Sequence, residues 1–136
     1  MNRDPLMPQE NILGCPITSS NTACCVEQIL SWIESGEKNK YFVCANPHSL
    51  EIAGKDPAYK QAMLAADLIT PDGIGVVMAS KILGGRIKDR VTGSDIFREV
   101  NTALNRRGGF RCFFLGSTGE NLSRIRDRMA KEFPRI

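Results

Sequence analysis

The sequence predicts an α/β fold, a Rossmann-like open, mainly parallel sheet that is flanked by helices and incomplete at its C-terminal end. Three observations support this prediction. The chain has 136 residues and is 42% hydrophobic, which is enough for the core of one domain. Strand-like and helix-like segments alternate, which favours crossover connections between parallel strands. The stretch "FRCFFLG" is continuously apolar, as is typical of strands that a parallel sheet buries on both faces.

The first half of the chain shows strand and helix signals in turn. A short strand is predicted at residues 11–17. A helix follows within residues 19–36, between a Ser/Asn/Thr cluster and a terminal glycine. Aromatic and β-branched residues predict a strand at 40–46. Residues 48–67 predict two short helices, with Asp56 as the cap of the second.

The second half continues the alternation. A brief buried strand is predicted at residues 68–70 and a helix at 74–85. A second helix is predicted at 94–109, followed by the apolar strand at 110–116 and a last helix within 117–133. The expected N-caps of the last two helices are Ser94 or Asp95, and Ser117 or Thr118.

The domain boundaries follow from the two ends of the sequence. Residues 1–10 are polar and contain two prolines, so we expect a flexible N-terminal arm. Residues 11–136 are expected to form a single α/β domain. Pro134 follows the last helix where the alternation requires another strand, so we expect this domain to be truncated. The first residues lack the apolar stretch of a signal peptide or a membrane span.

Charge and cysteine content limit the class of protein. The net charge of +3 is too small to indicate a nucleic-acid binder, although residues 101–136 hold eight Lys or Arg against three acids. That basic segment fits either a solvated helix face or an anionic ligand. The five cysteines form no Cys-x-x-Cys pair and indicate reduced core residues of a cytosolic protein. With one histidine, the sequence predicts no metal site.

Polar residues follow three of the predicted strands, in "CANPHS", "TPDGIG" and "FLGSTGE". Ligands of open parallel sheets bind outside the carboxyl ends of the strands. We therefore expect one rim to carry Cys44, Asn46, Thr70, Asp72, Ser117 and Thr118.

Simpler explanations exist for each of these turns. Asn-Pro and Asp-Gly form turns without any function. "LGSTGE" lacks the full dinucleotide-binding spacing, although Gly116, Ser117 and Thr118 could offer a helix N-terminus to a phosphate. Arg90 in "DRVTGSD" lies in a loop, where a guanidinium suits a diphosphate or a carboxylate.

Taken together, these stretches resemble a known family. "CANPHSLEIAGKDPAYKQAMLAADLITPDGIGVVMASKILGG", followed by "DRVTGSD" and "FFLGSTGE", is similar to the bacterial WecG/TagA/CpsF glycosyltransferases. The resemblance runs from about residue 10 to the end. Members of that family continue well beyond the point at which this chain stops.

The resemblance implies an inverting transfer of an N-acetylmannosamine-type sugar. The donor would be a UDP-sugar, and the acceptor an undecaprenyl-diphosphate-linked N-acetylglucosamine in cell-surface polysaccharide or teichoic acid synthesis. By position, Asp72 matches the general base, Asn46 a pocket asparagine and Arg90 an essential arginine. Cys44 stands where many members have threonine. The implied substrate-binding set is Cys44, Asn46, Gly73, Gly75, Arg90, Gly116, Ser117 and Thr118.

The resemblance also implies the setting of the reaction. No metal or cofactor is expected beside the UDP-sugar, and the enzyme would act in the cytoplasm, at the inner face of the plasma membrane. Peripheral membrane contact and a homo-oligomer are further expectations. The main alternative is a nucleotide-binding α/β module without catalysis. A nucleic-acid binder using the arginine-rich last helix is the least supported reading, because no aromatic platform accompanies the arginines.

Overall fold

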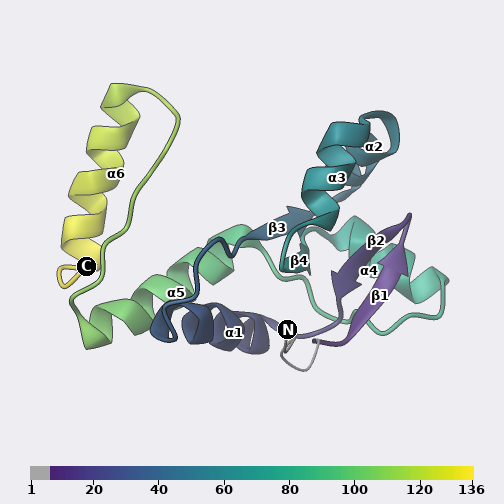
Figure 1. Ribbon diagram of the computed structural model, residues 1–136, viewed down its shortest axis with the longest axis horizontal. Coiled ribbons are helices and arrows are strands. Elements are labelled where there is room, and N and C mark those ends of the chain that lie inside the picture. Colours follow the sequence, from purple (N-terminus) through teal and green to yellow (C-terminus); the bar gives the residue numbers. More distant parts are fainter. Residues whose placement is uncertain (1–6) are drawn as a thin grey trace. The chain divides into compact units, whose positions relative to one another are not determined.

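The computed structural model describes residues 7–136, and the chain folds as a mixed α/β protein with short sheets (Figure 1). It divides into two compact units, Met1–Ile96 and Phe97–Ile136. The part of the predicted N-terminal arm at residues 1–6 lies outside the described residues.

The first unit begins with a β-hairpin. Strands β1 (Gln9–Ile12) and β2 (Cys15–Thr18) pair antiparallel, so β1 starts within the predicted arm and the predicted single strand at 11–17 is in fact two strands. The reason is the turn at Leu13 and Gly14, which have φ of 52° and 82°. Two successive residues at positive φ form the tight turn that reverses a chain into a hairpin.

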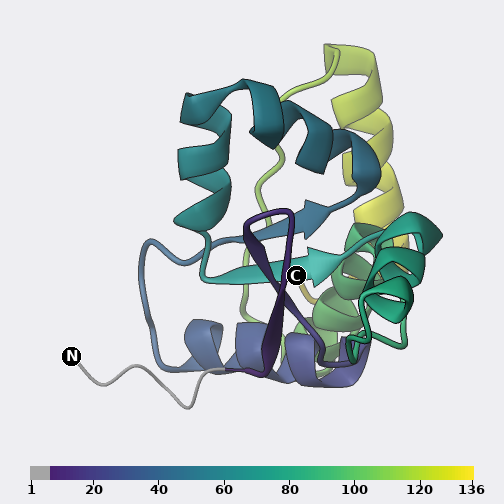
Figure 2. The ribbon, with the colours of Figure 1, turned by 90° about the vertical axis from the view of Figure 1, so that its right-hand side faces the viewer.

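A parallel strand pair forms the centre of the first unit. Strands β3 (Phe42–Ala45) and β4 (Leu68–Pro71) pair with Phe42 opposite Leu68 and Ala45 opposite Pro71. Helices α2 (Pro47–Lys55) and α3 (Pro57–Leu64) make the crossover between them. Figure 2 shows both strands pointing the same way, with the crossover helices above them and α1 (Thr22–Glu34) below.

The structure confirms the helices predicted in the first unit. Side chains adjacent in sequence cap α1 and α3, which is why the sequence could predict where they begin. The side chain of Asn21 accepts a hydrogen bond from the backbone N–H of Cys24 at the start of α1. Asp56 accepts from Ala58 and Tyr59 at the start of α3, as predicted. Such capping groups satisfy backbone donors that a helix leaves without partners. Helix α4 (Ile74–Ile82) also forms where the sequence predicts it.

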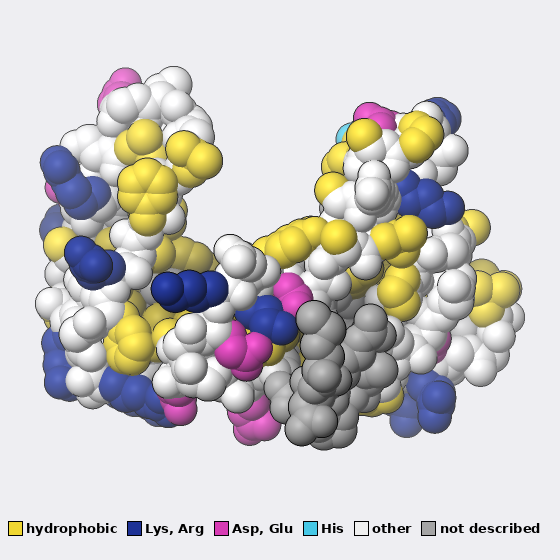
Figure 3. Space-filling view, viewed as in Figure 1, with side chains coloured by type: hydrophobic (Ala, Val, Ile, Leu, Met, Phe, Trp, Pro, Cys, Tyr) yellow, Lys and Arg dark blue, Asp and Glu magenta, His cyan; other side chains and the backbone are white. Residues whose placement is uncertain are grey.

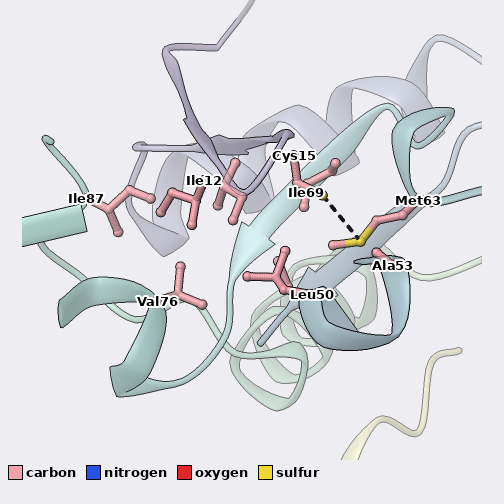
Figure 4. Packing of buried hydrophobic residues seen from close by; sticks show 10 residues of the cluster. Ile12, Cys15, Leu50, Ala53, Met63, Ile69, Val76 and Ile87 are labelled. Atoms are coloured by element: carbon pink, nitrogen blue, oxygen red, sulfur yellow. Dashed lines mark hydrogen bonds between the residues drawn. The ribbon is translucent and has the colours of Figure 1, made fainter. Parts of the chain in front are cut away.

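One core holds the hairpin, the strand pair and helices α2, α3 and α4 together. Figure 4 shows side chains from β1, β2, α2, α3, β4 and α4 meeting in one cluster. Its buried members are Ile12, Cys15, Ile17, Ala45, Leu50, Ala53, Met63, Ile69, Val76 and Ile87. The Cys15 thiol lies 4.0 Å from the Met63 sulfur. Because the core contacts both β4 and α4, it fixes the turn that joins them.

The second unit contains most of α5 (Gly93–Arg107) and all of α6 (Gly119–Glu132). Both helices were predicted. Thr118 caps α6 by accepting from the N–H of Asn121. At the start of α5 the hydroxyl of Thr92, rather than Ser94 or Asp95, accepts from a backbone N–H.

The strand predicted at residues 110–116 is absent. This segment belongs to no helix or sheet, and Phe113 and Leu115 are 85% and 92% exposed. Apolar composition favours burial, but only hydrogen bonds to a neighbouring strand make a segment part of a sheet. The larger parallel sheet that the sequence predicts is therefore seen only as the β3–β4 pair.

All five cysteines are free, as predicted. Cys15 and Cys25 are buried and Cys44 is half-buried. Cys24 and Cys112 are exposed, so the expectation that the cysteines are core residues is wrong for these two. Burial raises the pKa of the Cys25 thiol to about 11. This thiol therefore stays protonated at neutral pH and packs as a small apolar group.

Candidate functional site

The turns after β3 and β4 lie side by side at the carboxyl end of the strand pair. Ala45 and Pro71 are register partners, and the backbone N–H of Asp72 donates to the carbonyl oxygen of Ala45 at 2.8 Å. Asn46 and Asp72 are the next residues along the two strands. The parallel arrangement therefore brings the two turns together, as expected for a site at a strand end.

Two glycines allow this close approach. Gly73 has φ of +100°, which residues with a Cβ rarely adopt. At Gly75, an added Cβ would stand only 2.7 Å from Cγ of Pro47. The turn after β4 therefore packs directly against the first residue of α2. Gly73 and Gly75 shape the backbone beside Asp72, which is half-buried.

Asn46 uses part of its side chain to build the fold. Its amide oxygen accepts from the N–H of Ser49 at 2.9 Å, and its own N–H donates to the Ser49 hydroxyl at 2.9 Å. This reciprocal pair caps α2. Because the side-chain oxygen of Asn46 already accepts the Ser49 hydrogen bond, the group that Asn46 can offer to a ligand is its amide NH₂.

Cys44 connects three elements of the site. Its sulfur lies 3.6 Å from the hydroxyl of Thr70, and 3.1 Å from the position that a Cβ on Gly93 would take. Burial raises the pKa of the Cys44 thiol. The Thr70 hydroxyl and the Gly93 N–H oppose that rise, whereas the negative charge of Asp72 adds to it. Cys44 is thus a neutral thiol at neutral pH, close to the Asp72 carboxylate.

Thr70 is fully buried, so it does not form part of an open rim. Its hydroxyl lies 3.5 Å from the carbonyl oxygen of Val43, in addition to the Cys44 contact. The expectation that Thr70 lies on the rim is therefore wrong. The reason is that β4 is buried at every position, so its last residues cannot reach solvent before Asp72.

The loop that carries Arg90 returns to the same strand end. The N–H of Val91, the next residue, donates to the carbonyl oxygen of Pro71 at 2.8 Å. Val91 is fully buried, whereas Arg90 is exposed. The backbone at Arg90 is thus held next to the turn that contains Asp72, although the two residues are eighteen positions apart.

Three helices begin at this strand end. Helix α2 starts after Asn46, α4 after Gly73, and α5 at Gly93, beside Cys44. The N-cap of α4 is Gly73, so no side chain caps the first N–H groups of this helix. Helix N-termini carry free donors and partial positive charge, which favour phosphate groups. The arrangement combines these donors with a carboxylate and an exposed guanidinium.

The third predicted turn lies in the second unit. Gly116 and Ser117 have φ of +106° and +68°, and the Ser117 hydroxyl accepts from the amide of Asn121 at 3.1 Å. With Thr118 they start α6, as the sequence predicts. Their place relative to Asp72 stays a prediction, as do the ligand-binding roles assigned to all of these residues.

Sequence reasoning missed one residue that shapes the site. The carboxylate of Glu10, from β1, accepts from the N–H groups of Arg86 and Ile87 and holds the loop that leads to Arg90. Ser80 supports the same loop by accepting from the Ile87 N–H at 3.1 Å. The one signal in the sequence was the pair Gly84-Gly85, because glycine permits another group to approach the backbone closely. In the structure, a Cβ added at Gly85 would lie 2.5 Å from the Glu10 carboxylate.

Other surfaces of the described residues offer less. A shallow hollow of about 520 Å³ opens beside Pro8 and α1, among Ser20, Cys24 and Gln28, and none of the candidate site residues lines it. Residues 7–136 contain no group of three or more His, Cys, Asp or Glu side chains placed to hold a metal ion. Across the same residues, every helix is too short or too polar to cross a membrane.

Comparison with known proteins gives one matching family model. The model described as "Glycosyl transferase WecG/TagA/CpsF family" matches residues 10–136, which is most of the chain. This match covers the turns at Asn46 and Asp72, the Arg90 loop and the turn at Ser117.

Three curated relatives share the same name, N-acetylglucosaminyldiphosphoundecaprenol N-acetyl-beta-D-mannosaminyltransferase. The protein of Bacillus spizizenii (strain ATCC 23059 / NRRL B-14472 / W23) is 34% identical over 99 residues, which are 73% of this chain and 38% of the relative. That of Bacillus subtilis (strain 168) is 27% identical over 130 residues, 96% of this chain and 50% of the relative. That of Staphylococcus aureus (strain NCTC 8325 / PS 47) is 28% identical over 127 residues, which are 93% of this chain and 50% of the relative. The chain thus spans half or less of each of these relatives.

Proposed function

Since the chain belongs to the WecG/TagA/CpsF family of glycosyltransferases, we propose that it supplies the donor site and the general base of an inverting sugar transferase. The sugar is of the N-acetylmannosamine type, and the donor is a UDP-sugar. The acceptor is an N-acetylglucosamine linked through a diphosphate to undecaprenol, the group named in the relatives. The product would serve cell-surface polysaccharide or teichoic acid synthesis.

The single observation that carries this proposal is the convergence of Asp72, Arg90 and three helix N-termini at one strand end. In the proposed step, the Asp72 carboxylate takes the proton of the acceptor hydroxyl. The acceptor oxygen then forms a bond to the anomeric carbon from the face opposite the donor diphosphate. The bond between that carbon and the diphosphate oxygen breaks, and UDP leaves with the electron pair, so the configuration inverts.

The leaving group explains why one carboxylate is enough. The departing diphosphate is already anionic and needs hydrogen-bond donors rather than a proton. Arg90 and the N–H groups at the start of α4 supply those donors, and the amide of Asn46 adds another. General-base catalysis is typically worth ~10²–10⁴-fold in rate, or about 3–5 kcal/mol of the barrier. We propose that no metal or other cofactor takes part.

Replacement of Asp72 by Asn tests the assignment. We expect Asp72→Asn to lower the rate of transfer by ~10²–10⁴-fold. The Kd of UDP, measured by titration calorimetry, should stay within about twofold, because Asn keeps the shape of the side chain. Asp89→Asn is the matched control, since it removes an exposed carboxylate from the nearby loop and should leave the rate unchanged. An Asp72→Asn protein as active as the parent would remove the mechanism.

A second function, a nucleotide-binding α/β module without catalysis, is favoured by the starts of α2, α4 and α5 at the strand end, because helix N-termini suit the phosphates of a nucleotide whether or not a transfer follows. Titration of UDP with and without the lipid-linked acceptor separates the two functions. Binding with turnover supports the transferase, and binding without turnover supports the module.

Three further features of the whole protein belong to the same proposal. The β3–β4 pair would be part of a Rossmann-like, mainly parallel sheet, since its crossover by α2 and α3 is of the type found in such sheets. The enzyme would act at the cytoplasmic face of the plasma membrane, in peripheral contact with it, because its proposed acceptor is a lipid. We also propose that it forms homo-oligomers, because the parallel pair presents sheet edges that further strands can join.

A further inference from the structure

The hairpin at the start of the chain reaches the loop that carries Arg90. One oxygen of the Glu10 carboxylate, in β1, accepts from the backbone N–H groups of both Arg86 and Ile87. Arg86 lies 76 positions later in the sequence. The buried Ser80 hydroxyl donates to the same carboxylate and accepts from the Ile87 N–H at 3.1 Å. A carboxylate with three donors makes a strong contact, because hydrogen bonds to a charged acceptor exceed neutral ones.

This contact leaves no room for a side chain at Gly85. An added Cβ would lie 2.5 Å from both carboxylate oxygens of Glu10 and 2.6 Å from the hydroxyl oxygen of Ser80. A glycine is therefore required for the loop backbone to approach the carboxylate this closely. The contact is built from both sides, so a change in β1 or a change in the loop should break it.

A second anchor holds the other end of the loop. The N–H of Val91 donates to the carbonyl oxygen of Pro71 at 2.8 Å, and Val91 is fully buried. Ile87 packs in the same buried cluster as Ile12 of β1 (Figure 4). Only residues 88–90 lie between the two anchors, and all three are exposed. Because both ends of so short a segment are fixed, few backbone conformations remain open to it.

The exposed part of the loop carries charge. Space-filling shows Lys and Arg side chains at the surface of the end of the first unit that carries the hairpin (Figure 3). The loop contributes Lys88, Asp89 and Arg90 to the exposed surface. A cation stabilises a leaving diphosphate best when it is already in place, because a mobile loop must first be ordered at a cost in free energy.

We propose that Glu10 is a positioning residue of the transferase, which fixes the loop at 86–91 so that Arg90 meets the donor diphosphate at the end of β4. This inference rests on the function proposed above, because Arg90 has this role only if a diphosphate binds there. Glu10 acts through the backbone of the loop and does not itself contact the donor. The hairpin thereby contributes to the site from outside the parallel strand pair.

A purely structural role for Glu10 makes a different prediction. If the carboxylate only stabilised the fold, its removal would affect UDP binding equally whether or not Arg90 is present. If it acts through Arg90, its removal should matter only while that guanidinium is there. A double-mutant cycle between the two residues distinguishes these roles.

The test measures the Kd of UDP for the whole chain by titration calorimetry, at a temperature where circular dichroism shows every variant folded. We expect Arg90→Ala to weaken UDP about tenfold and Glu10→Ala about fivefold. The double variant Glu10→Ala/Arg90→Ala should bind UDP no more weakly than Arg90→Ala alone. The proposal is wrong if the two effects multiply, or if Glu10→Ala binds UDP as tightly as the parent.

Four further variants make the test specific. Glu10→Gln keeps one oxygen that can accept from both N–H groups, so it should weaken UDP less than Glu10→Ala. Gly85→Ala displaces the carboxylate from the loop side and should weaken UDP like Glu10→Ala. Gly54→Ala, in open space within α2, should leave the Kd unchanged. Val26→Ala lowers stability from α1, outside the cluster that contains Ile87, and should also leave it unchanged.

Amide hydrogen exchange followed by NMR reports on the loop without any ligand. Glu10→Ala should speed exchange of the Arg86 N–H, which Glu10 accepts, but not of the Asp72 N–H, which is bonded to Ala45. Faster exchange at Arg86 with an unchanged Kd would make Glu10 a structural residue only and overturn the proposal. A parent chain that does not bind UDP would instead reject the donor site itself, and an unchanged Kd in Arg90→Ala would reject the role of that arginine.

Discussion

The two units of the chain differ in how far they bury their apolar segments. In the first unit, every residue of β4 is buried, and this strand joins a core that seven helices and strands build together. In the second unit, α6 buries none of its residues, and the apolar segment at 110–116 stays largely exposed. Both segments are similarly apolar, so the difference in burial comes from the segments that pack against each of them.

What holds the second unit together is mainly polar. The guanidinium of Arg135 donates to the carbonyl oxygens of Arg106 and Arg107 at 2.6 and 3.0 Å, which closes the end of α5. The rings of Phe97 and Phe114 lie 6.0 Å apart. Leu104 and Phe133 are buried. These contacts order two helices, but they bury far less apolar surface than the core of the first unit.

The largest expected effect comes from removing apolar volume in each unit. Ile69→Ala deletes a side chain that is 2% exposed in β4, and Leu115→Ala deletes one that is 92% exposed. We expect Ile69→Ala to lower the free energy of unfolding by about 2–5 kcal/mol, because it leaves a cavity. Leu115→Ala should change it by less than about 0.5 kcal/mol. Urea unfolding followed by circular dichroism measures both.

The comparison would fail if the two substitutions cost the same. A large loss for Leu115→Ala would show that residues 110–116 are buried in solution, by another part of the chain or by a second copy. Sedimentation at several protein concentrations separates those cases, since burial by a second copy depends on concentration.

A smaller effect is expected at the glycines that begin helices in the two units. Gly75→Ala would place a Cβ 2.7 Å from Pro47, and we expect it to cost about 1–3 kcal/mol by overpacking. Gly119→Ala has open space around the new Cβ and should be neutral or stabilising by about 0.5–1 kcal/mol. Thermal unfolding of the two variants measures both changes in stability.

Gly75→Ala should also disturb the candidate site, because the turn after β4 carries Asp72. We expect weaker UDP binding by calorimetry, with no such change for Gly119→Ala. If Gly75→Ala proved as stable as the parent and bound UDP equally well, the close packing between the two turns would not shape the site.

The same contrast explains what could be predicted from the sequence. Helix limits were predictable wherever a nearby side chain caps the helix, as Asn21, Asp56 and Thr118 do. Strands β3 and β4 were predictable because each is short, apolar and bounded by turn residues. The failure at 110–116 concerns a contact between segments far apart in sequence, which composition does not encode.

The candidate site was predictable to a similar degree. The turns at Asn46 and Asp72 could be expected together because parallel strands end at the same edge. The burial of Thr70 could not, since it depends on the core behind β4. Nor could the capping role of the Asn46 oxygen or the link from Glu10 to the Arg90 loop. These three features depend on tertiary contacts that no local sequence pattern predicts.

The smallest effect expected is at two glutamates, Glu10 in the first unit and Glu120 in the second. Burial raises the pKa of Glu10, but hydrogen bonds from Ser80, Arg86 and Ile87 outweigh it and leave the pKa below its ordinary value. Glu120 is 74% exposed and pairs with Arg124 in the next turn of α6. We expect Glu10→Gln to cost roughly 1–2 kcal/mol of stability, and Glu120→Gln about 0.3–0.5 kcal/mol.

The pH dependence separates these two glutamates further. A folded-state pKa below the unfolded one means that ionised Glu10 stabilises the folded state above the unfolded pKa of about 4.3. That stabilisation is lost as pH falls through the lower, folded pKa. Urea unfolding of the parent from pH 7 to pH 3 should therefore lose a contribution that Glu10→Gln lacks, so the two proteins converge in stability at acid pH. Parallel curves for the two proteins would mean that the carboxylate charge does not hold the loop that leads to Arg90, and the hydrogen bonds alone would then have to position that arginine.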